Sequence, residues 1–302
     1  MEILQSPGNI RSILFVGEGN FSFSRSLIDL WSNPNYKVTA TCYESEPTSD
    51  QAKSNIETLV ENGVSVEMEY DATKIENTDG LMFDLIIFMF PHIGGKMKIG
   101  KNRTLLKNFA TSVEKVTHEH SRVIVSLCDG QGGTEFDVKK RKEADSWQIV
   151  KMMSYGHFGL IAVDGFDQHQ FQDYRSFGYR SLNKGFHTEQ GKNHVFCKKL
   201  PLQSDMFLCV PTYENDLSFW LPKPLKVFEI TTFEDLIKEM NEGAVKTISL
   251  IDSYYDSKKD IHSQTIRLYY HSNKIIRSPK EIMDLHYKIG HKLHDKLGIT
   301  VR

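Results

Sequence analysis

The stretch LFVGEGNFSFS, residues 14–24, places two glycines and an acidic side chain between an apolar run and a serine-rich segment. Gly17 and Gly19 permit backbone angles that other residues avoid, and they let a ligand approach the main chain closely. Glu44 ends the next apolar run, where a carboxylate can accept hydrogen bonds from both hydroxyls of a ribose. Asp71 follows a third run and can meet an adenine edge. This pattern indicates a nucleoside-bearing ligand, although a purely structural set of turns is the alternative.

The spacing within the glycine turn narrows the choice of ligand. A full G-x-G-x-x-G would favour a dinucleotide, with its pyrophosphate at the helix N-terminus. Here Ser22 occupies the position of the third glycine, and there is no P-loop lysine. S-adenosyl-L-methionine fits better because it has a ribose, an adenine and an amino acid but no phosphate. The expected cofactor-binding residues are Gly17, Glu18, Gly19, Asn20, Phe21, Glu44 and Asp71.

Strands and helices alternate through the first part of the chain. This rhythm predicts parallel strands with helices on both faces of the sheet, a Rossmann-like α/β domain over residues 1–200. The turns described above would all lie at the carboxyl ends of those strands, where such sheets bind ligands. The expected strands are 12–16, 37–43, 64–70, 83–90, 122–127 and 193–198, and the expected helices are 22–32, 48–62, 101–117 and 146–155.

The composition changes near residue 200, where prolines and polar residues without periodicity indicate a linker. Beyond it the order of elements is β-α-β-β-α-β, which is the ferredoxin-like split motif. We therefore expect a second, α+β domain over residues 207–302. Its expected strands are 217–221, 245–252, 263–271 and the closing run 298–302, and its expected helices are 232–242 and 279–297.

Composition also restricts the partners and the compartment. The 302 residues carry a formal net charge of −2, so a nucleic-acid partner would be held by local basic patches, with salt-dependent affinity. Four cysteines without C-x-x-C spacing indicate buried thiols in a reducing compartment and no metal site. The first residues, MEILQSPGNIRS, show no basic region followed by an apolar stretch, and no apolar run approaches the ~18 residues that span a bilayer. We expect a cytoplasmic or nuclear protein, including the nucleolus, with no membrane association.

Several motifs carry a resemblance to known families. ILFVGEGNFSFSRSL, FPHIGG, KNRTLL, CDGQGGT and SWQ, within residues 10–200, resemble the eukaryotic ribosomal-RNA uridine-N3-methyltransferase-like domain. DLSFWLP, ISLIDSYY, RLYYHS and LGITVR resemble the ferredoxin-fold anticodon-binding domain of phenylalanyl-tRNA synthetases. The two in this order resemble the family of ferredoxin-fold anticodon-binding domain-containing proteins. The resemblance implies an S-adenosylmethionine-dependent RNA methyltransferase fold joined to a tRNA-binding-type module, with ribosomal RNA or tRNA as partner.

Methyl transfer to uridine N3 requires in-line positioning and loss of the imide proton. His92 is a candidate for taking that proton or orienting the base, although it could instead bond a backbone carbonyl. Asp129 is the second catalytic candidate, on a glycine-rich loop that could fold over the substrate or simply connect two elements. Phe90, beside Pro91, could stack on a flipped base; a core phenylalanine is the alternative.

Basic residues follow this segment and could contact RNA phosphates, or form an ordinary solvated helix face. They are Lys96, Lys98, Lys101, Arg103 and Lys107. Met89 stands where uridine-methylating relatives typically carry asparagine, which offers a donor and an acceptor that a thioether lacks. Two hypotheses therefore stay open: an RNA methyltransferase, and a catalytically inactive RNA- or tRNA-binding protein with a methyltransferase-like scaffold. A protein partner is compatible with either.

Overall fold

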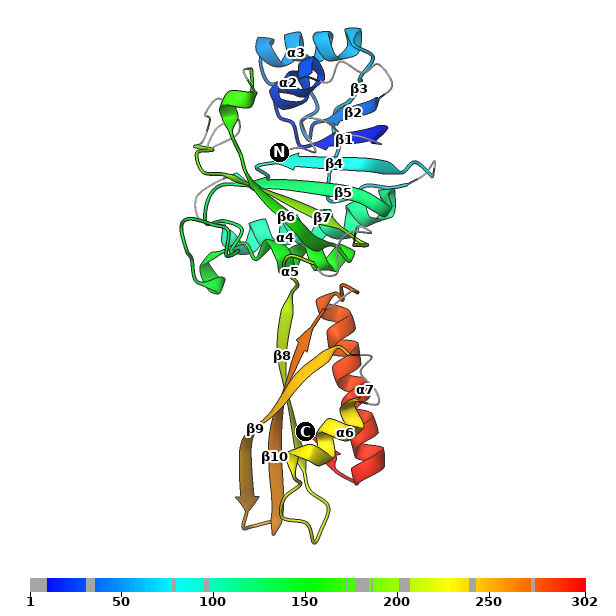
Figure 1. Ribbon diagram of the computed structural model, residues 1–302, viewed down its shortest axis with the longest axis vertical. Helices are drawn as coiled ribbons and strands as arrows, with labels where there is room; N and C mark the ends of the chain where they lie inside the picture. The colour runs from blue at the N-terminus through cyan, green and yellow to red at the C-terminus, as the bar shows by residue number, and fades with distance from the viewer. Residues whose placement is uncertain are drawn as a thin grey trace. The chain divides into compact units, whose positions relative to one another are not determined.

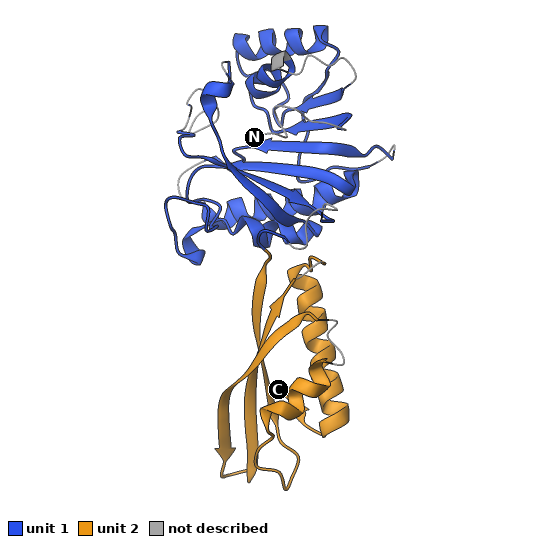
Figure 2. Cartoon of the chain, in the orientation of Figure 1, with its two compact units in different colours: residues 1–209 blue, residues 210–302 orange. Residues whose placement is uncertain are grey.

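The computed structural model describes residues 10–30, 36–77, 80–94, 98–171, 173–176, 185, 187–200, 207–238, 243–272 and 275–302. The chain divides into two compact units, Met1–Cys209 and Val210–Arg302 (Figure 2). No helix among these described residues is both long and apolar enough to cross a bilayer.

The first unit contains a seven-stranded sheet with the order β3-β2-β1-β4-β5-β7-β6 (Figure 1). Neighbouring strands from β3 to β5 pair in parallel, whereas β7 runs antiparallel to both β5 and β6. The strands are β1 (Ser12–Val16), β2 (Lys37–Thr41), β3 (Ser65–Glu67), β4 (Phe83–Met89), β5 (Thr117–Leu127), β6 (Gly159–Gly165) and β7 (Lys192–Cys197). The predicted Rossmann-like α/β fold is confirmed.

Helices cover both faces of this sheet, and β1 shows why. In its sequence SILFV the side chains of Ile13 and Phe15 enter one core, and those of Leu14 and Val16 enter the other. All four are fully buried, as expected for a parallel strand between two helical layers. The helices are α2 (Ser22–Leu30) and α3 (Asp50–Glu61) on one face, and α4 (Ile99–Val113) and α5 (Ile149–Met153) on the other (Figure 1).

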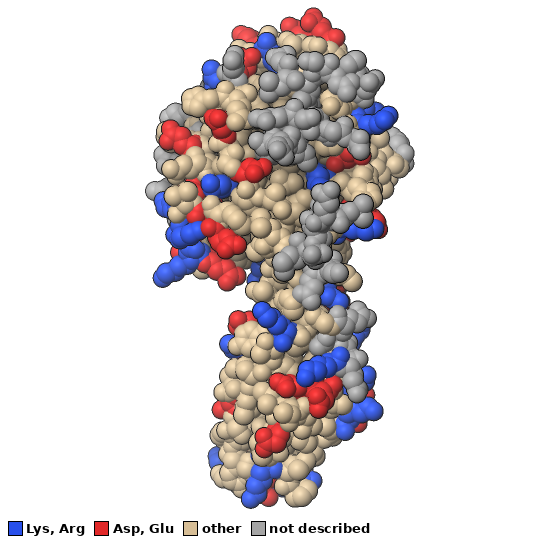
Figure 3. Space-filling model, in the orientation of Figure 1, with Lys and Arg blue, Asp and Glu red and all other residues tan. Residues whose placement is uncertain are grey.

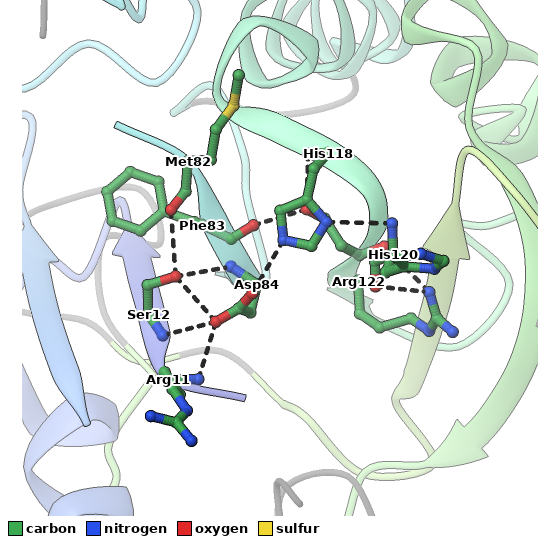
Figure 4. A network of polar contacts seen from close by, with 9 residues as sticks. Arg11, Ser12, Met82, Phe83, Asp84, His118, His120 and Arg122 are labelled. Carbon is green, nitrogen blue, oxygen red and sulfur yellow. Dashed lines mark hydrogen bonds and ion pairs between the residues drawn. The ribbon is translucent and has the colours of Figure 1, made fainter. Parts of the chain in front are cut away.

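A polar network ties β1, β4 and β5 together near their amino-terminal ends (Figure 4). One carboxylate oxygen of Asp84 accepts hydrogen bonds from the backbone amides of Arg11 and Ser12, at 2.8 and 2.9 Å. The other lies 2.9 Å from Nε2 of His118, whose Nδ1 accepts the amide of His120. Burial alone would raise the pKa of the Asp84 carboxyl, but these hydrogen bonds outweigh it and lower the pKa. The ionised Asp84 carboxylate therefore holds the amino-terminal ends of β1, β4 and β5 together, opposite the carboxyl ends of these strands.

The second unit is a four-stranded antiparallel sheet with the order β11-β8-β10-β9, packed against two helices. Its elements are β8 (Thr212–Trp220), α6 (Ile230–Lys238), β9 (Val245–Asp256), β10 (Ile261–His271), α7 (Pro279–Leu297) and β11 (Thr300–Val301). Helix α7 begins with a capping box between Ser278 and Glu281 and ends at Gly298, whose φ is 64°. The predicted β-α-β-β-α-β ferredoxin-like order is confirmed.

Several element boundaries differ from expectation, most clearly those of β5 and β8. β5 begins at Thr117, five residues before the predicted start, because the predicted helix over 101–117 ends at Val113. β8 begins at Thr212 and is longer than the predicted strand. β6 was not expected at all.

Candidate cofactor-binding site

A cavity of about 620 Å³ opens at the carboxyl ends of β1, β2, β3 and β4. The order of strands reverses between β1 and β4, and open α/β sheets bind ligands at such a point. The volume lies within the ~300–1,000 Å³ typical of small-molecule sites. The strand ends contribute Gly17, Glu18, Gly19, Tyr43, Glu44, Tyr70, Asp71, Ala72, Thr73, Met89, Phe90, Pro91, His92, Ile93 and Gly94 to the lining.

The glycine turn between β1 and α2 is open toward the cavity because both glycines adopt left-handed angles. The φ of Gly17 is 66° and that of Gly19 is 62°. A Cβ atom at position 17 would lie 2.6 Å from Cε2 of Phe88 on β4. Any side chain there would therefore meet both backbone strain and a clash with a packed ring.

Asn20 and Phe21 stabilise the glycine turn and do not belong to the described lining of the cavity. The side-chain oxygen of Asn20 accepts a hydrogen bond from the amide of Ser22 at the start of α2, and its carbonyl accepts one from Asn55. Phe21 is fully buried in the core, with a φ of 57°. Both residues shape the loop that presents Glu18 and Gly19.

Glu18 is the acidic side chain of this turn and lines the cavity. Its carboxylate accepts a hydrogen bond of 2.9 Å from the amide of Ser24, in the first turn of α2. Burial raises the pKa of the Glu18 carboxyl to about 7, against a smaller lowering by the hydrogen bonds from Ser24. The residue is half-buried, and its carboxyl therefore titrates near neutrality within the lining of the site.

Glu44 is held in place by a thiol. The Sγ of Cys42 lies 2.8 Å from one carboxylate oxygen of Glu44, and 3.6 Å from the carbonyl of Gly19. Burial and then the neighbouring carboxylate raise the pKa of the Cys42 thiol to about 12, so it stays protonated and donates. The buried cysteine thus connects the acidic end of β2 to the glycine turn.

Asp71 follows β3 and lines the same cavity. One oxygen of its carboxylate accepts hydrogen bonds from the amide and hydroxyl of Thr73, at 2.9 and 2.6 Å, and the other faces Lys74 at 3.4 Å. Burial acts to raise the pKa of Asp71, but these donors outweigh it and lower the pKa. The side chain is therefore ionised and oriented by its own turn.

The end of β4 forms the remaining wall. Phe90 has a φ of 47° and is only 4% exposed, with its ring stacked on Tyr174 at a centroid distance of 6.5 Å. It also packs edge-on against Phe166 at 5.0 Å. Phe90 and Pro91 line the cavity, so the structure brings the expected target-binding residues beside the expected cofactor-binding ones. A base could reach the Phe90 ring only along its cavity-facing edge.

His92 lines the cavity with a defined orientation. Its Nδ1 lies 3.1 Å from the carbonyl oxygen of Phe90. A carbonyl accepts but does not donate, so Nδ1 carries a proton in this contact. The ring therefore fixes the turn through Nδ1, which is the alternative considered from the sequence, while its place in the lining leaves the catalytic role a prediction.

Met89 lies in a row that crosses three strands. The register pairs Met89 with Ser126 on β5 and Ser126 with Asn193 on β7. The hydroxyl of Ser126 lies 3.1 Å from Sδ of Met89 and 2.5 Å from the side-chain oxygen of Asn193. Met89 lines the cavity but offers only a weak acceptor to it.

Asp129 does not belong to the described lining of the cavity, to which His92 contributes. Its two carboxylate oxygens accept the backbone amides of Val138 and Lys139, at 2.7 and 2.8 Å. Asp137 of the same loop accepts the amide of Gly130. The loop after β5 is thus organised by its own aspartates, and Asp129 supports that loop.

The basic residues that follow β4 are dispersed. Arg103 donates to the backbone carbonyls of Glu143, Ala144 and Ser146, so its guanidinium holds a distant loop. Lys98 donates to the carbonyl of Gly94 at 2.7 Å, and Lys101 is exposed on α4. Lys107 lies over the Tyr155 ring, and Lys96 lies outside the described residues.

Among the lining residues that were not identified from the sequence, two belong to the segment after the unexpected strand β6. Tyr174 is buried against Phe23, Phe90 and Phe166, and Arg175 follows it. The amide of Arg175 donates to the hydroxyl of Ser22 at 3.0 Å, which attaches the segment to the start of α2. The aromatic residues of GFDQHQFQDY were the only available signal.

Two family models match the chain. One, described as rRNA (uridine-N3-)-methyltransferase BTM5-like, matches residues 14–178, which is more than half of the chain and includes the strand ends around the cavity. The chain belongs to this family. The second, the ferredoxin-fold anticodon binding domain, matches residues 209–302. The two-domain architecture expected from the motifs is confirmed, and S-adenosyl-L-methionine is the cofactor of its Rossmann-like domain.

Individual proteins are also similar to this chain. Ferredoxin-fold anticodon-binding domain-containing protein 1 of Homo sapiens is 35% identical over 245 residues, 79% of this chain and 38% of that protein. The probable mitochondrial phenylalanine–tRNA ligase of Drosophila melanogaster is 30% identical over 95 residues, 30% of this chain and 21% of that protein. The solved S-adenosylmethionine-dependent methyltransferase from Clostridium acetobutylicum aligns with a TM-score of 0.39 at 12% identity, covering 65% of this chain and 87% of that one. The chain thus spans little more than a third of the human relative.

The donor set of the cavity fits this cofactor. Glu44 at the end of β2 is placed for a ribose diol, and the ionised Asp71 after β3 for an amine on an adenine edge. The open glycine turn leaves room for an amino-acid moiety beside Glu18. The acidic lining disfavours a pyrophosphate, in agreement with the departure from the dinucleotide motif.

Proposed function

We propose that this protein is an S-adenosylmethionine-dependent RNA methyltransferase that acts on N3 of uridine, with ribosomal RNA as its substrate. One observation carries the proposal: the residues after β1, β2 and β3 that suit the cofactor share a single cavity with Phe90, Pro91 and His92. Membership of the uridine-N3-methyltransferase-like family supports the choice of acceptor.

The lining residues at one end of the cavity would hold the cofactor, and those at the other end would hold the target base. When bound, the cofactor supplies an electrophilic methyl group. Gly17 and Gly19 admit its amino-acid end, Glu44 accepts hydrogen bonds from its ribose, and Asp71 orients its base. Positioning of this kind supplies most of the rate enhancement in a displacement at carbon.

At the target end, the uracil must be turned out of its RNA and lose the proton on N3. His92 is the group for that step, because it is an imidazole that lines the cavity beside Phe90 and Pro91 and is oriented by the Phe90 carbonyl. The N3–H bond would break toward the imidazole of His92, and the electron pair left on N3 would take the methyl group that a bound cofactor supplies, with the C–S bond breaking to leave S-adenosylhomocysteine. Pro91 and the edge of Phe90 limit where the base can lie.

RNA would be held by local contacts with basic side chains rather than by a positive electrostatic field over the whole protein. Lysine and arginine side chains alternate with acidic ones over the visible face (Figure 3). Lys98 and Lys101 lie near the cavity, and Lys288, Lys292 and Lys296 are exposed along α7 of the second unit. Arg267 of β10 is paired with both oxygens of Asp216, so the α7 lysines are the better candidates for tRNA or rRNA phosphates.

A catalytically inactive RNA-binding protein is the second candidate, and Met89 is the observation that favours it. Its thioether accepts weakly from Ser126 and cannot both donate to and accept from a uracil edge. In that case the cavity could still hold the cofactor while no methyl group is transferred.

The first test measures cofactor binding by calorimetry in the wild type, Gly19→Arg and Glu44→Ala, with Glu57→Gln on the exposed face of α3 as the matched control. We expect binding by the wild type and the control only. Transfer of a tritiated methyl group to ribosomal RNA, followed by nucleoside analysis, then tests the chemistry. Binding without transfer, together with transfer by Met89→Asn, would support the inactive-scaffold alternative. No binding by the folded wild type would refute the proposed function.

A further inference from the structure

The loop between β5 and α5 contains a run of four basic residues, KKRK at 139–142. All four are exposed. Within the described part of the chain no acidic side chain forms an ion pair with them, and the Glu143 that follows faces Lys151 at 4.0 Å. Adjacent cations without acidic partners produce a local positive field on a protein whose net charge is −2. We call residues 138–146 the basic loop.

Asp129 holds the beginning of the basic loop. Its two carboxylate oxygens accept the backbone amides of Val138 and Lys139, at 2.7 and 2.8 Å. Gly130 packs against the same place with a φ of 76°, and a Cβ atom on it would lie 2.8 Å from the carbonyl oxygen of Lys139 and 3.0 Å from Nε of Arg141. The first part of the loop is therefore packed directly against the residues that follow β5.

Arg103 on α4 holds the other end of the basic loop. Its guanidinium donates to the carbonyl oxygens of Glu143, Ala144 and Ser146, at distances between 2.6 and 2.9 Å. The basic run thus lies between two fixed stretches of backbone. A loop that is already ordered loses less conformational entropy when its side chains bind a partner.

The basic loop begins beside the target end of the cavity. Strands β4 and β5 are parallel neighbours, and the amide of Phe90 donates to the carbonyl oxygen of Ser126 at 2.9 Å. Asp129 follows two residues after β5 ends at Leu127. The phosphates that flank a uridine held at Phe90 would therefore lie along the edge of the sheet from which the loop extends.

We propose that the basic loop binds the phosphate backbone of RNA beside the target uridine, and that Asp129 and Arg103 are positioning residues that present it. The inference rests on the proposed function, which places the target base at Phe90. Lysine and arginine side chains neutralise phosphates without regard to base sequence, so such contacts fix the position of the strand while the cavity selects the base.

Three of the four basic side chains are the expected phosphate contacts. The Nζ of Lys140 donates to the carbonyl oxygen of Glu135 within the segment that leads to the loop. The other three are Lys139, Arg141 and Lys142. A basic run is also compatible with a nuclear-import signal. A receptor that binds a linear peptide would first have to break the contacts of Asp129 and Arg103, whereas phosphates can approach the exposed side chains as they stand.

The experiment measures the fluorescence anisotropy of a labelled oligouridylate with the full chain, between about 50 and 200 mM potassium chloride. The test variant combines Lys139→Gln, Arg141→Gln and Lys142→Gln. The matched control removes the same charge near the amino-terminal ends of the parallel strands, with Lys37→Gln, Lys115→Gln and Lys199→Gln. Asp129→Ala and Asp129→Asn test the positioning.

We expect the test variant to lose affinity at least about tenfold at the lower salt concentration. The slope of log affinity against log salt should fall by about 2, because each contact with a single strand contributes ~0.7. The control should keep the affinity and the slope of the wild type. Asp129→Ala should reduce both, and Asp129→Asn, which keeps one acceptor oxygen, should lie between it and the wild type.

Unchanged affinity and slope in the test variant would overturn the inference, as would an equal loss in the control. Loss of nuclear accumulation in cells without any change in RNA binding would assign the run to an import receptor instead. Calorimetry with S-adenosylmethionine separates the two proposals. A wild type that binds the cofactor but binds the oligonucleotide without help from the loop, or not at all, refutes the inference alone, whereas a folded wild type that binds neither refutes the proposed function.

Discussion

Replacing Glu18 by glutamine should stabilise the cofactor-free protein, and increasingly so as the pH rises. The pKa of the folded carboxyl lies near 7, above its ordinary value of 4.5, because it is buried. The folded state therefore binds this proton more tightly than the unfolded chain. Stability from Glu18 is fully present below about pH 4.5 and is lost as the pH rises to about 7. The free energy of unfolding lost over this interval, at ~1.36 kcal/mol per pH unit, is about 3 kcal/mol.

The assay should report on the first unit alone. Cys197 is buried on β7, so its alkylation in increasing urea, read by mass spectrometry and normalised to unfolded protein at each pH, gives the free energy of unfolding there. We expect the advantage of Glu18→Gln over wild type to grow by about 2.5 kcal/mol between pH 5 and pH 8. Glu57→Gln should show no such trend. A constant difference across this range would refute the argument from burial.

Three further changes test the geometry. Gly17→Ala should weaken cofactor binding at least tenfold by calorimetry, because its Cβ would meet Phe88 at 2.6 Å; unchanged affinity would show that the turn is not part of the site. Cys42→Ala should cost about 1 kcal/mol of binding free energy through loss of the hydrogen bond to Glu44, and Cys42→Ser should restore most of it. Asp84→Ala should lower the free energy of unfolding by about 3 kcal/mol, because it leaves two backbone amides unpaired. Since the pKa of Asp84 is lowered, its contribution should also fade in the wild type as the pH falls below about 4.

Much of the fold could be predicted because its patterns are local. The four apolar runs that become β1, β2, β3 and β4 are each followed by a polar or glycine turn, and parallel pairing brings those turns to one edge. Gly17, Glu44 and Asp71 could therefore be grouped without knowledge of their contacts. The second unit could be predicted equally well, because the sequence of helix α7 contains its own capping box and terminal glycine.

The rest of the fold and of the site could not be predicted from the sequence, because it depends on contacts between distant segments. β6 has only four consecutive apolar residues, Leu160–Val163, between glycine and aspartate, which is too short to identify from periodicity. Tyr174 was missed along with it. Asp129 stays a predicted catalytic residue. Its contacts with the amides of Val138 and Lys139 could not be predicted, because they lie across a loop whose course no local pattern gives.

The Asp84 network also separates the support of the strands from the lining of the cavity. It holds β1, β4 and β5 together at the ends of the strands opposite the glycine turn, through two backbone amides and the ring of His118. A substitution at Met89 therefore changes the acceptor that the cavity offers while it leaves the contacts of Asp84 in place.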